Sequence, residues 1–413
     1  MTLIKTSILT GISTIIVAIS TFIINKVIAL YIGPTGLAIV GQLQNFITMI
    51  TTFSNGAISS GIVKYTAQYQ TIEEKQKIFS SSVVISLICS FFISVFLFEF
   101  REYLSELILK DSSFTRVFVV FGTTIFLFAL NMVLISILNG QKEIKKYVLV
   151  NIASSLFSLI ITTILVMQLN LIGALYALVV NQSVVFFVTL VFVLKSSWFK
   201  LEYFIKGIDK DSLNKLSKYS IMAITTAIAV PVSHLIIRNY IGENLGWDSA
   251  GYWQGIWYIS NMYLMLVTTT LSVYYLPRLS EIQDNKELKA EILSGYKIIM
   301  PIVIFGALII FLLKDYAILI AFSKDFMPMI ELFKWQLIGD VTKIASWLFG
   351  YLLIAKAMAK IFVYTEILFS ILFIVLSIFF VNIFGLVGIT YAYAFNYFLH
   401  LIMMIFIFRS RFL

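Results

Sequence analysis

Six ionisable side chains lie inside long apolar stretches of the sequence: Lys26, His234, Arg238, Asp340, Lys343 and Glu366. A charge at the centre of a bilayer costs about 2.5–3.5 kcal/mol on insertion scales, so residues that remain there are candidate functional groups. His234 and Arg238 are four residues apart, and Asp340 and Lys343 are three apart. If both stretches are helical, each pair shares one helix face.

The types of these residues favour an anionic substrate that also carries hydroxyl groups. Ammonium and guanidinium groups bind phosphate, and amides and aromatic rings suit sugars. We therefore predict a substrate site built from charged residues and a polar lining, namely Lys26, Lys64, Arg238, Asp340 and Lys343 with Gln42, Asn45, Trp253, Gln254 and Asn261.

Three of the titratable groups are candidates for coupling to an ion gradient: Asp340, His234 and Glu366. Two of them have a second interpretation, since His234 also suits a packed polar position and Glu366 an interfacial one. The same alternatives hold for the charged substrate residues. Lys26 and Arg238 lie near span ends, where cationic side chains reach the interface, and Asp340 and Lys343 can neutralise each other across one helical turn.

The composition requires that these groups be positioned by a membrane-embedded framework. Of 413 residues, 60% are hydrophobic and 12% charged, whereas a soluble domain has about 45–50% apolar and about 25% charged residues. Such a chain must expose apolar surface to lipid. The net charge of +9 arises from basic loops, so it does not indicate a nucleic-acid partner.

A transmembrane helix needs about 20 mostly apolar residues, and the sequence offers twelve such stretches. They are 7–31, 37–62, 79–98, 117–138, 148–167, 171–194, 219–240, 253–276, 298–313, 333–355, 361–382 and 387–408. Lys and Arg gather in the tails and in alternate loops, with six lysines in 195–218. The positive-inside rule therefore places both termini in the cytoplasm. We expect an all-α polytopic membrane protein.

The chain also repeats itself. The stretch 171–195 resembles 386–410, matching Gly173 with Gly388, and 26–33 (KVIALYIG) echoes 235–242 (LIIRNYIG). We predict two parallel six-helix lobes, 1–195 and 218–413, joined by a cytoplasmic amphipathic linker at 196–217 that we expect to be helical. Transporters built from such repeats bind substrate in a cavity between them, and Lys26 and Arg238 would face each other there.

Sequence signatures of enzymes are absent. There is no phosphate-binding Gly loop followed by Lys and Ser or Thr, no HExxH and no GxSxG. The single cysteine, Cys89, lies in an apolar run, and no cluster of metal-ligating residues is present. We therefore expect a transporter without a catalytic residue, metal site or cofactor.

Several stretches resemble the Wzx polysaccharide-unit translocases, a branch of the multidrug/oligosaccharidyl-lipid/polysaccharide exporter superfamily. They include KVIALYIGPTGLAIVGQLQNFIT (26–48), NGAISSGIVKYTAQY (55–69), GYWQGIWYISNMYL (251–264), SVYYLPRLSE (272–281) and ELFKWQLIGDVTKIASWLFGYLLIAKA (331–357). The likeness covers nearly the whole chain and is nearest to the branch that handles enterobacterial common antigen lipid III and O-antigen units.

The resemblance implies a flippase of the bacterial inner membrane. Its cargo would be an undecaprenyl-pyrophosphate-linked oligosaccharide, moved from the cytoplasmic to the periplasmic leaflet by alternating access. Membrane lipids, a polysaccharide polymerase and a chain-length regulator are the implied partners. Lys26, Lys64, Arg238, Asp340 and Lys343 fall at charged positions of the resemblance, and Gln42, Asn45, Trp253 and Gln254 fall at polar ones.

Two other classes of function stay open from the sequence. A proton- or sodium-coupled exporter of small cationic drugs has the same superfamily fold. Its binding site would favour a carboxylate facing the cavity, whereas most of the charged side chains within the spans here are cationic. A membrane-embedded glycosyltransferase or polymerase would need large external loops, whereas the longest one expected here is 99–116.

Overall fold

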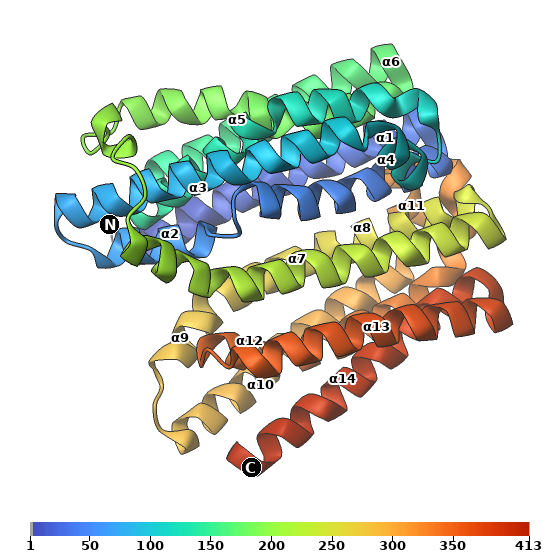
Figure 1. Ribbon diagram of the computed structural model, residues 1–413. Helices are drawn as coiled ribbons and strands as arrows, with labels where there is room; N and C mark the ends of the chain where they lie inside the picture. Colours follow the sequence, from blue (N-terminus) through green and yellow to red (C-terminus); the bar gives the residue numbers. More distant parts are fainter. Residues whose placement is uncertain (1–2, 413) are drawn as a thin grey trace. The chain divides into compact units, whose positions relative to one another are not determined.

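Every regular element of the described chain is helical. The computed structural model describes the backbone of residues 3–412, with the side chains of 3–8, 182, 218–219, 273 and 410–412 left out. Across this range it contains fourteen α-helices, short 3-10 and π-helical turns, and no strand (Figure 1). The predicted all-α class is therefore confirmed.

The first half of the chain forms six α-helices before the 3-10 turn Leu201–Phe204: α1 (Leu3–Ser54), α2 (Ser59–Gln68), α3 (Ile72–Glu99), α4 (Arg101–Leu104), α5 (Thr115–Gly140) and α6 (Ile144–Leu194). The second half comprises α7 (Lys210–Leu245), α8 (Trp247–Thr270), α9 (Leu276–Glu281), α10 (Asn285–Leu312), α11 (Lys314–Ala321), α12 (Phe333–Ala355), α13 (Ala359–Phe384) and α14 (Gly388–Phe412).

Eight helical segments in the described part of the chain are long and apolar enough to cross a membrane. Three of them, 9–54, 144–194 and 359–409, are 46, 51 and 51 residues long, about twice what one pass requires. Non-helical backbone at Gly33, Asn170 and Gly385 divides each of the three. Counting each of these three segments as two passes gives eleven passes. Helix α8, whose polar side chains lower its hydropathy, would be the twelfth, so the arrangement is compatible with twelve passes. The number of passes and the side of the termini stay predictions.

Two helix breaks have the same local geometry at positions matched by the sequence repeat. Asn170 and Gly385 have φ values of 50° and 61°. Three residues later, Gly173 lies against the carbonyl oxygen of Leu165, and Gly388 against that of Phe380. The second sequence echo lacks such a match, because Gly33 has a φ of 65° whereas its counterpart Gly242 lies inside α7.

Contacts divide the chain into two compact units. Unit 1 consists of the residues up to Tyr31 and Ile39–Pro231, and unit 2 of Ile32–Ala38 and the residues from Val232 onward. Helix α7 therefore begins in unit 1 and continues without a helical break across Pro231 into unit 2. The predicted lobes, with their boundary in the linker, stay a prediction.

In unit 1, α5 packs against α3 and α6, and α2 against α5. Serines recur at four-residue spacing along the buried face of α3, at Ser82, Ser86, Ser90 and Ser94. The Ser94 hydroxyl donates to the carbonyl oxygen of Gly122 in α5 at 2.8 Å. Small side chains allow helix backbones to approach closely in membranes, which explains how this serine-rich stretch of α3 packs closely against α5.

The short segment Ile32–Ala38 is held in unit 2 by the first turns of α8. The backbone N–H and the hydroxyl of Thr35 donate to Asp248 Oδ1 at 3.2 and 2.7 Å. Gly251 lies directly against Pro34, where an added Cβ would be 2.0 Å from the Pro34 carbonyl oxygen. Only glycine fits at position 251 without a shift of the backbone, so Gly251 and Asp248 together determine where this segment docks.

The structure differs from the sequence expectation in two elements. The expected helix across 195–218 is replaced by the 3-10 turn Leu201–Phe204, a non-helical stretch and the start of α7 at Lys210. Phe204 is instead drawn into the core of unit 1, stacked on Phe79 at 5.6 Å between ring centroids. The ninth span was expected to begin at about 298, but α10 begins at Asn285 because Asp284 caps it by accepting from Glu287 N–H at 3.0 Å.

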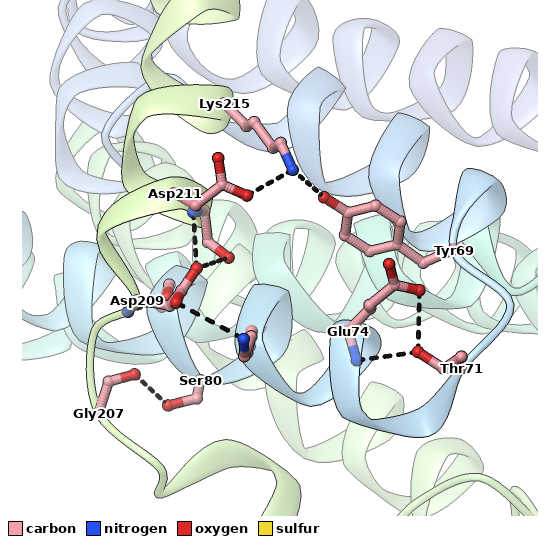
Figure 2. Close-up of polar contacts among 11 residues, drawn as sticks. Tyr69, Thr71, Glu74, Ser80, Gly207, Asp209, Asp211 and Lys215 are labelled. Carbon is pink, nitrogen blue, oxygen red and sulfur yellow. Dashed lines mark hydrogen bonds and ion pairs between the residues drawn. The ribbon is translucent and has the colours of Figure 1, made fainter.

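The linker is fastened to α3 by polar contacts at one end of unit 1 (Figure 2). The Ser80 hydroxyl donates to the Gly207 carbonyl at 2.5 Å, and Asp209 N–H donates to Ser81 Oγ at 3.0 Å. Lys215 bonds both the Tyr69 hydroxyl at 2.8 Å and Asp211, and these partners raise the pKa of Lys215. The start of α7 is thereby fixed to unit 1.

Asp209 caps α7, which leads to a prediction about pH. The backbone N–H and the hydroxyl of Ser212 both donate to its carboxylate at 2.8 Å, and these bonds lower the pKa of Asp209. The folded protein binds the Asp209 proton more weakly than the unfolded chain does. The cap therefore stabilises the fold fully at pH values above the pKa of the unfolded chain, about 3.9. This stabilisation is lost as the pH falls through the lower pKa of the folded protein. Asp209→Ala should cost about 1 kcal/mol at neutral pH.

The measurement is thermal unfolding of the purified protein from pH 7 down to acid. We expect the difference between wild type and Asp209→Ala to shrink in acid. Asp211→Ala is the matched control, since its exposed pair with Lys215 should contribute less than about 1 kcal/mol. An Asp209→Ala difference that does not change with pH would show that the charge of the cap is unimportant.

Candidate functional site

A polar cluster lies in the interior of unit 2, formed by side chains of α7, α8, α12 and α14. On α7, Arg238 is only 1% exposed. Its guanidinium donates to Gln254 Oε1 on α8 and lies over the Trp253 ring, 5.3 Å from the centroid. A buried cation requires such compensation, and a cation held over an indole face gains about 2 kcal/mol or more when desolvated. Arg238 is therefore held in place inside the unit.

His234 lies one turn before Arg238 and is surrounded by rings. Its imidazole centroid is 5.4 Å from that of Trp253 and 4.6 Å from that of Trp257. Since Trp253 and Trp257 are four residues apart on α8, both point to the same side of that helix. These contacts favour the packed interpretation of His234, and its coupling role stays a prediction.

Asp340 on α12 is fully buried and accepts three hydrogen bonds from hydroxyl groups. Ser260 donates at 2.7 Å, Tyr263 at 3.0 Å and Tyr393 at 2.9 Å. Gln336 donates in turn to Ser260 at 3.2 Å. Helices α8, α12 and α14 thus converge on one carboxylate. These donors compensate for its burial, because hydrogen bonds to charged groups are roughly twice as strong as neutral ones.

Lys343, one turn further along α12, lies in a cage of aromatic rings. Its ammonium nitrogen is 4.7 Å from the Trp347 centroid, 5.1 Å from that of Trp257 and 5.7 Å from that of Tyr397. Asp340 and Lys343, both within the described chain, form no ion pair with each other. The ring faces therefore stabilise this buried cation.

The other predicted site residues are spread more widely. In unit 1, Gln42 is fully buried, Lys26 and Asn45 are half-buried, and Lys64 is exposed with its ammonium 5.5 Å from the Tyr65 ring. In unit 2, Asn261 is exposed on α8, and Glu366 is half-buried on α13. The structure therefore groups Arg238, Trp253, Gln254, Asp340 and Lys343 around the α8 face, and the pairing of Lys26 with Arg238 stays a prediction.

Sequence reasoning missed most of the groups that complete this cluster: Trp257, Ser260, Tyr263, Gln336, Trp347, Tyr393 and Tyr397. A signal existed for three of them, because Trp257 and Ser260 follow Trp253 at helical spacing and Trp347 follows Lys343 by four residues. Nothing in the sequence indicated Tyr393 and Tyr397 on α14, because they lie far from Asp340 and Lys343 along the chain and contact them only through tertiary packing.

The cluster is rich in hydrogen-bond donors, and the described residues offer no metal centre. Arg238 and Lys343 carry positive charge, and the buried indole N–H groups of Trp253 and Trp257 have no hydrogen-bond acceptor among the described residues. Across the described residues, no group of three or more His, Cys, Asp or Glu side chains could hold a metal ion. The surplus of donors matches a ligand rich in oxygen acceptors.

Comparison with solved structures identifies the fold. The fold is that of transporters of the MOP superfamily. It matches an inward-facing multidrug resistance MATE family transporter with a TM-score of 0.82 and 14% identity, covering 96% of this chain and 94% of that one. It also matches the lipid II flippase MurJ with a TM-score of 0.73 and 17% identity, covering 98% and 87% of the two chains. The chain is a multi-pass membrane protein.

Sequence comparison then gives the family. The chain belongs to the polysaccharide biosynthesis protein family, which it matches over residues 41–331. It is 27% identical over 398 residues to the lipid III flippases of Escherichia coli (strain K12) and Shigella flexneri, with 96% of each chain covered. The resemblance drawn from the sequence stretches is confirmed.

Proposed function

We propose that the protein is a flippase that moves an undecaprenyl-pyrophosphate-linked oligosaccharide from the cytoplasmic to the periplasmic leaflet of the bacterial inner membrane. The observation that carries the proposal is the donor-rich cluster of unit 2, in a chain that matches lipid III flippases along almost its whole length. Its cations suit the diphosphate, and its aromatic rings and amide suit sugars. A polysaccharide polymerase and a chain-length regulator would act on the product.

We assign substrate contact to Arg238, Lys343, Trp253 and Gln254 in unit 2, and to Lys26, Lys64, Gln42 and Asn45 in unit 1. Asn261 and Asp340 complete the predicted set. Asp340 has a second role in this proposal, because its three hydroxyl partners hold α8, α12 and α14 together. Asp340, His234 and Glu366 remain the candidates for ion coupling.

Export of cationic drugs is the second candidate function, and the MATE family fold favours it. A site for cations would present an acidic side chain to its ligand. The Asp340 carboxylate is instead occupied by three hydroxyl donors of the protein, with Lys343 one turn away. The chemistry of the cluster therefore supports a flippase over a drug exporter.

The deciding experiment is deletion of the gene in its host, followed by analysis of surface glycans and lipid-linked intermediates. We expect one glycan to disappear and its undecaprenyl-linked unit to accumulate on the cytoplasmic leaflet. Complementation with the wild-type gene should restore both. Intact glycans together with new sensitivity to cationic drugs, reversed by complementation, would instead establish the exporter.

A further inference from the structure

An open groove lies on the surface of unit 2 between α12, α13 and α14. Its volume is about 430 Å³, within the range of about 300–1,000 Å³ found for ligand sites. Six aromatic side chains line it, namely Trp335, Phe380, Phe384, Tyr391, Phe395 and Phe398. We call it the aromatic groove.

The lining of the aromatic groove is suited to hydrocarbon and to little else. Ile338, Ala394 and Thr342 supply the rest of it. The Thr342 hydroxyl bonds back to the carbonyl oxygens of Ile338 and Gly339 at 3.1 and 2.9 Å, so its hydrogen-bonding capacity is used within its own helix. A sugar or a phosphate would find almost no partner here.

The rings support one another, so the groove is preformed. Tyr391 meets Trp335 and Phe384 edge to face, each at 5.1 Å between centroids. Phe380 makes edge contacts with both Tyr391 and Phe395, at 6.4 and 6.3 Å. Such contacts add to the stability of ring pairs beyond simple burial, and the groove is consequently held open.

Two helices carry both the aromatic groove and the polar cluster. On α12, Thr342 faces the groove, and the next residue, Lys343, enters the cluster. On α14, Tyr391 lines the groove, while Tyr393 bonds Asp340. A helix with its side chains is about 10–12 Å across, so a polar head in the cluster and an apolar tail in the groove would be separated by about one helix.

We propose that the aromatic groove binds the polyisoprenyl chain of the cargo; this inference rests on the proposed function. A polyprenyl-linked substrate has one polar end and one long apolar end, and unit 2 offers a matching surface for each. One end of the groove lies at the first turn of α12 and the last residue of α13. Both of these helix ends are predicted to be periplasmic. The tail would be held there as the polar head reaches the outer leaflet.

The first test is photo-crosslinking of the full-length protein in lipid nanodiscs. Undecaprenyl diphosphate with a diazirine in its tail is compared with phosphatidylglycerol carrying the same group in an acyl chain. We expect the prenyl probe to label α12 and α14 at the groove, with competition by unmodified undecaprenyl phosphate. Equal labelling by both probes would identify a general lipid surface, and crosslinks between two copies of the protein would identify a dimer contact; either result overturns the proposal.

The second test fills the groove and measures transport in proteoliposomes. Ile338→Trp places a large ring in it, and Ile371→Trp on α13 is the matched control, since both isoleucines are exposed (41% and 56%) and only Ile338 lines the groove. We expect Ile338→Trp to slow the transport of cargo with a long tail about tenfold, which is the effect of about one lost side-chain contact. Transport of a cargo with a two-isoprene tail should be unchanged.

The outcomes separate the two proposals. If the wild-type protein moves neither cargo, the proposed function fails, while the crosslinking result still decides whether the groove binds prenyl chains. If the wild type moves both and Ile338→Trp behaves like Ile371→Trp, the groove has no role in transport. Slowing of both cargoes to the same degree would point to a general packing defect and would also overturn the inference.

Discussion

Replacing Arg238 with Gln is expected to abolish surface polysaccharide while leaving the protein in the membrane. The guanidinium is almost wholly buried, bonded to Gln254 and stacked on Trp253. In the proposed function the guanidinium also binds the diphosphate of the cargo, and truncating one partner of such a charged contact costs about 2–5 kcal/mol, which corresponds to a loss of about 30-fold to more than 1,000-fold in binding. The measurement is complementation of a deletion strain, with membrane protein levels checked in parallel.

Two further variants make this prediction specific. Arg238→Lys keeps the charge but loses the planar fork that binds phosphate with two bonds, and we expect partial activity from it. Arg278→Gln is the matched control, because Arg278 is also an arginine on an α-helix but is only half-buried and is paired with Glu287 and Glu291. Normal polysaccharide from Arg238→Gln at normal protein level would remove Arg238 from the mechanism.

Most of the fold could be predicted because the signals were local. Runs of about 20 apolar residues require helices in a bilayer, whose backbone groups find no other partners. The helix breaks were readable where glycine allowed an unusual backbone, as at Gly33 and Gly385. Asn170, which takes a similar conformation, was predictable only through its position before Gly173 in the repeat.

The linker could not be predicted, because its conformation depends on a distant helix. Its charge pattern suits an amphipathic helix, yet hydrogen bonds from Ser80 and to Ser81 on α3 hold residues 207–209 in a non-helical conformation (Figure 2). Burial of Phe204 against Phe79 compensates for the lost helical turn. Tertiary contacts of this kind routinely override local propensity.

Part of the site was predictable because its signal, like that of the helices, was local. Asp340 and Lys343 are three residues apart, and helical spacing places both in the interior. The sequence offered an ion pair between them as one interpretation. The structure shows hydroxyl groups around Asp340 and rings around Lys343. Apart from Trp347 on α12, these partners come from α8 and α14, far away along the chain.

Asp340→Ala is expected to destabilise unit 2 severely. It would remove the common acceptor of Ser260, Tyr263 and Tyr393, of which Ser260 and Tyr393 are each about 1% exposed. A buried polar group left without a partner costs about 1–3 kcal/mol, so the loss should reach several kcal/mol. The measurements are the yield of protein in the membrane and the melting temperature of the purified protein.

Variants at Asp340 and Lys343 should separate stability from transport. Asp340→Asn keeps a carbonyl oxygen as acceptor, so it should retain more of the stability than Asp340→Ala. Lys343→Met fills the aromatic cage without a charge, so it should fold normally and lose transport, because the cage exposes no other cation to an anionic cargo. An Asp340→Ala protein as stable as wild type would mean that the three hydroxyls find other acceptors, and that the carboxylate is held there for its charge alone. In that case Asp340 would become the leading candidate for ion coupling, since a buried carboxylate without a structural role remains in a membrane only where function requires it.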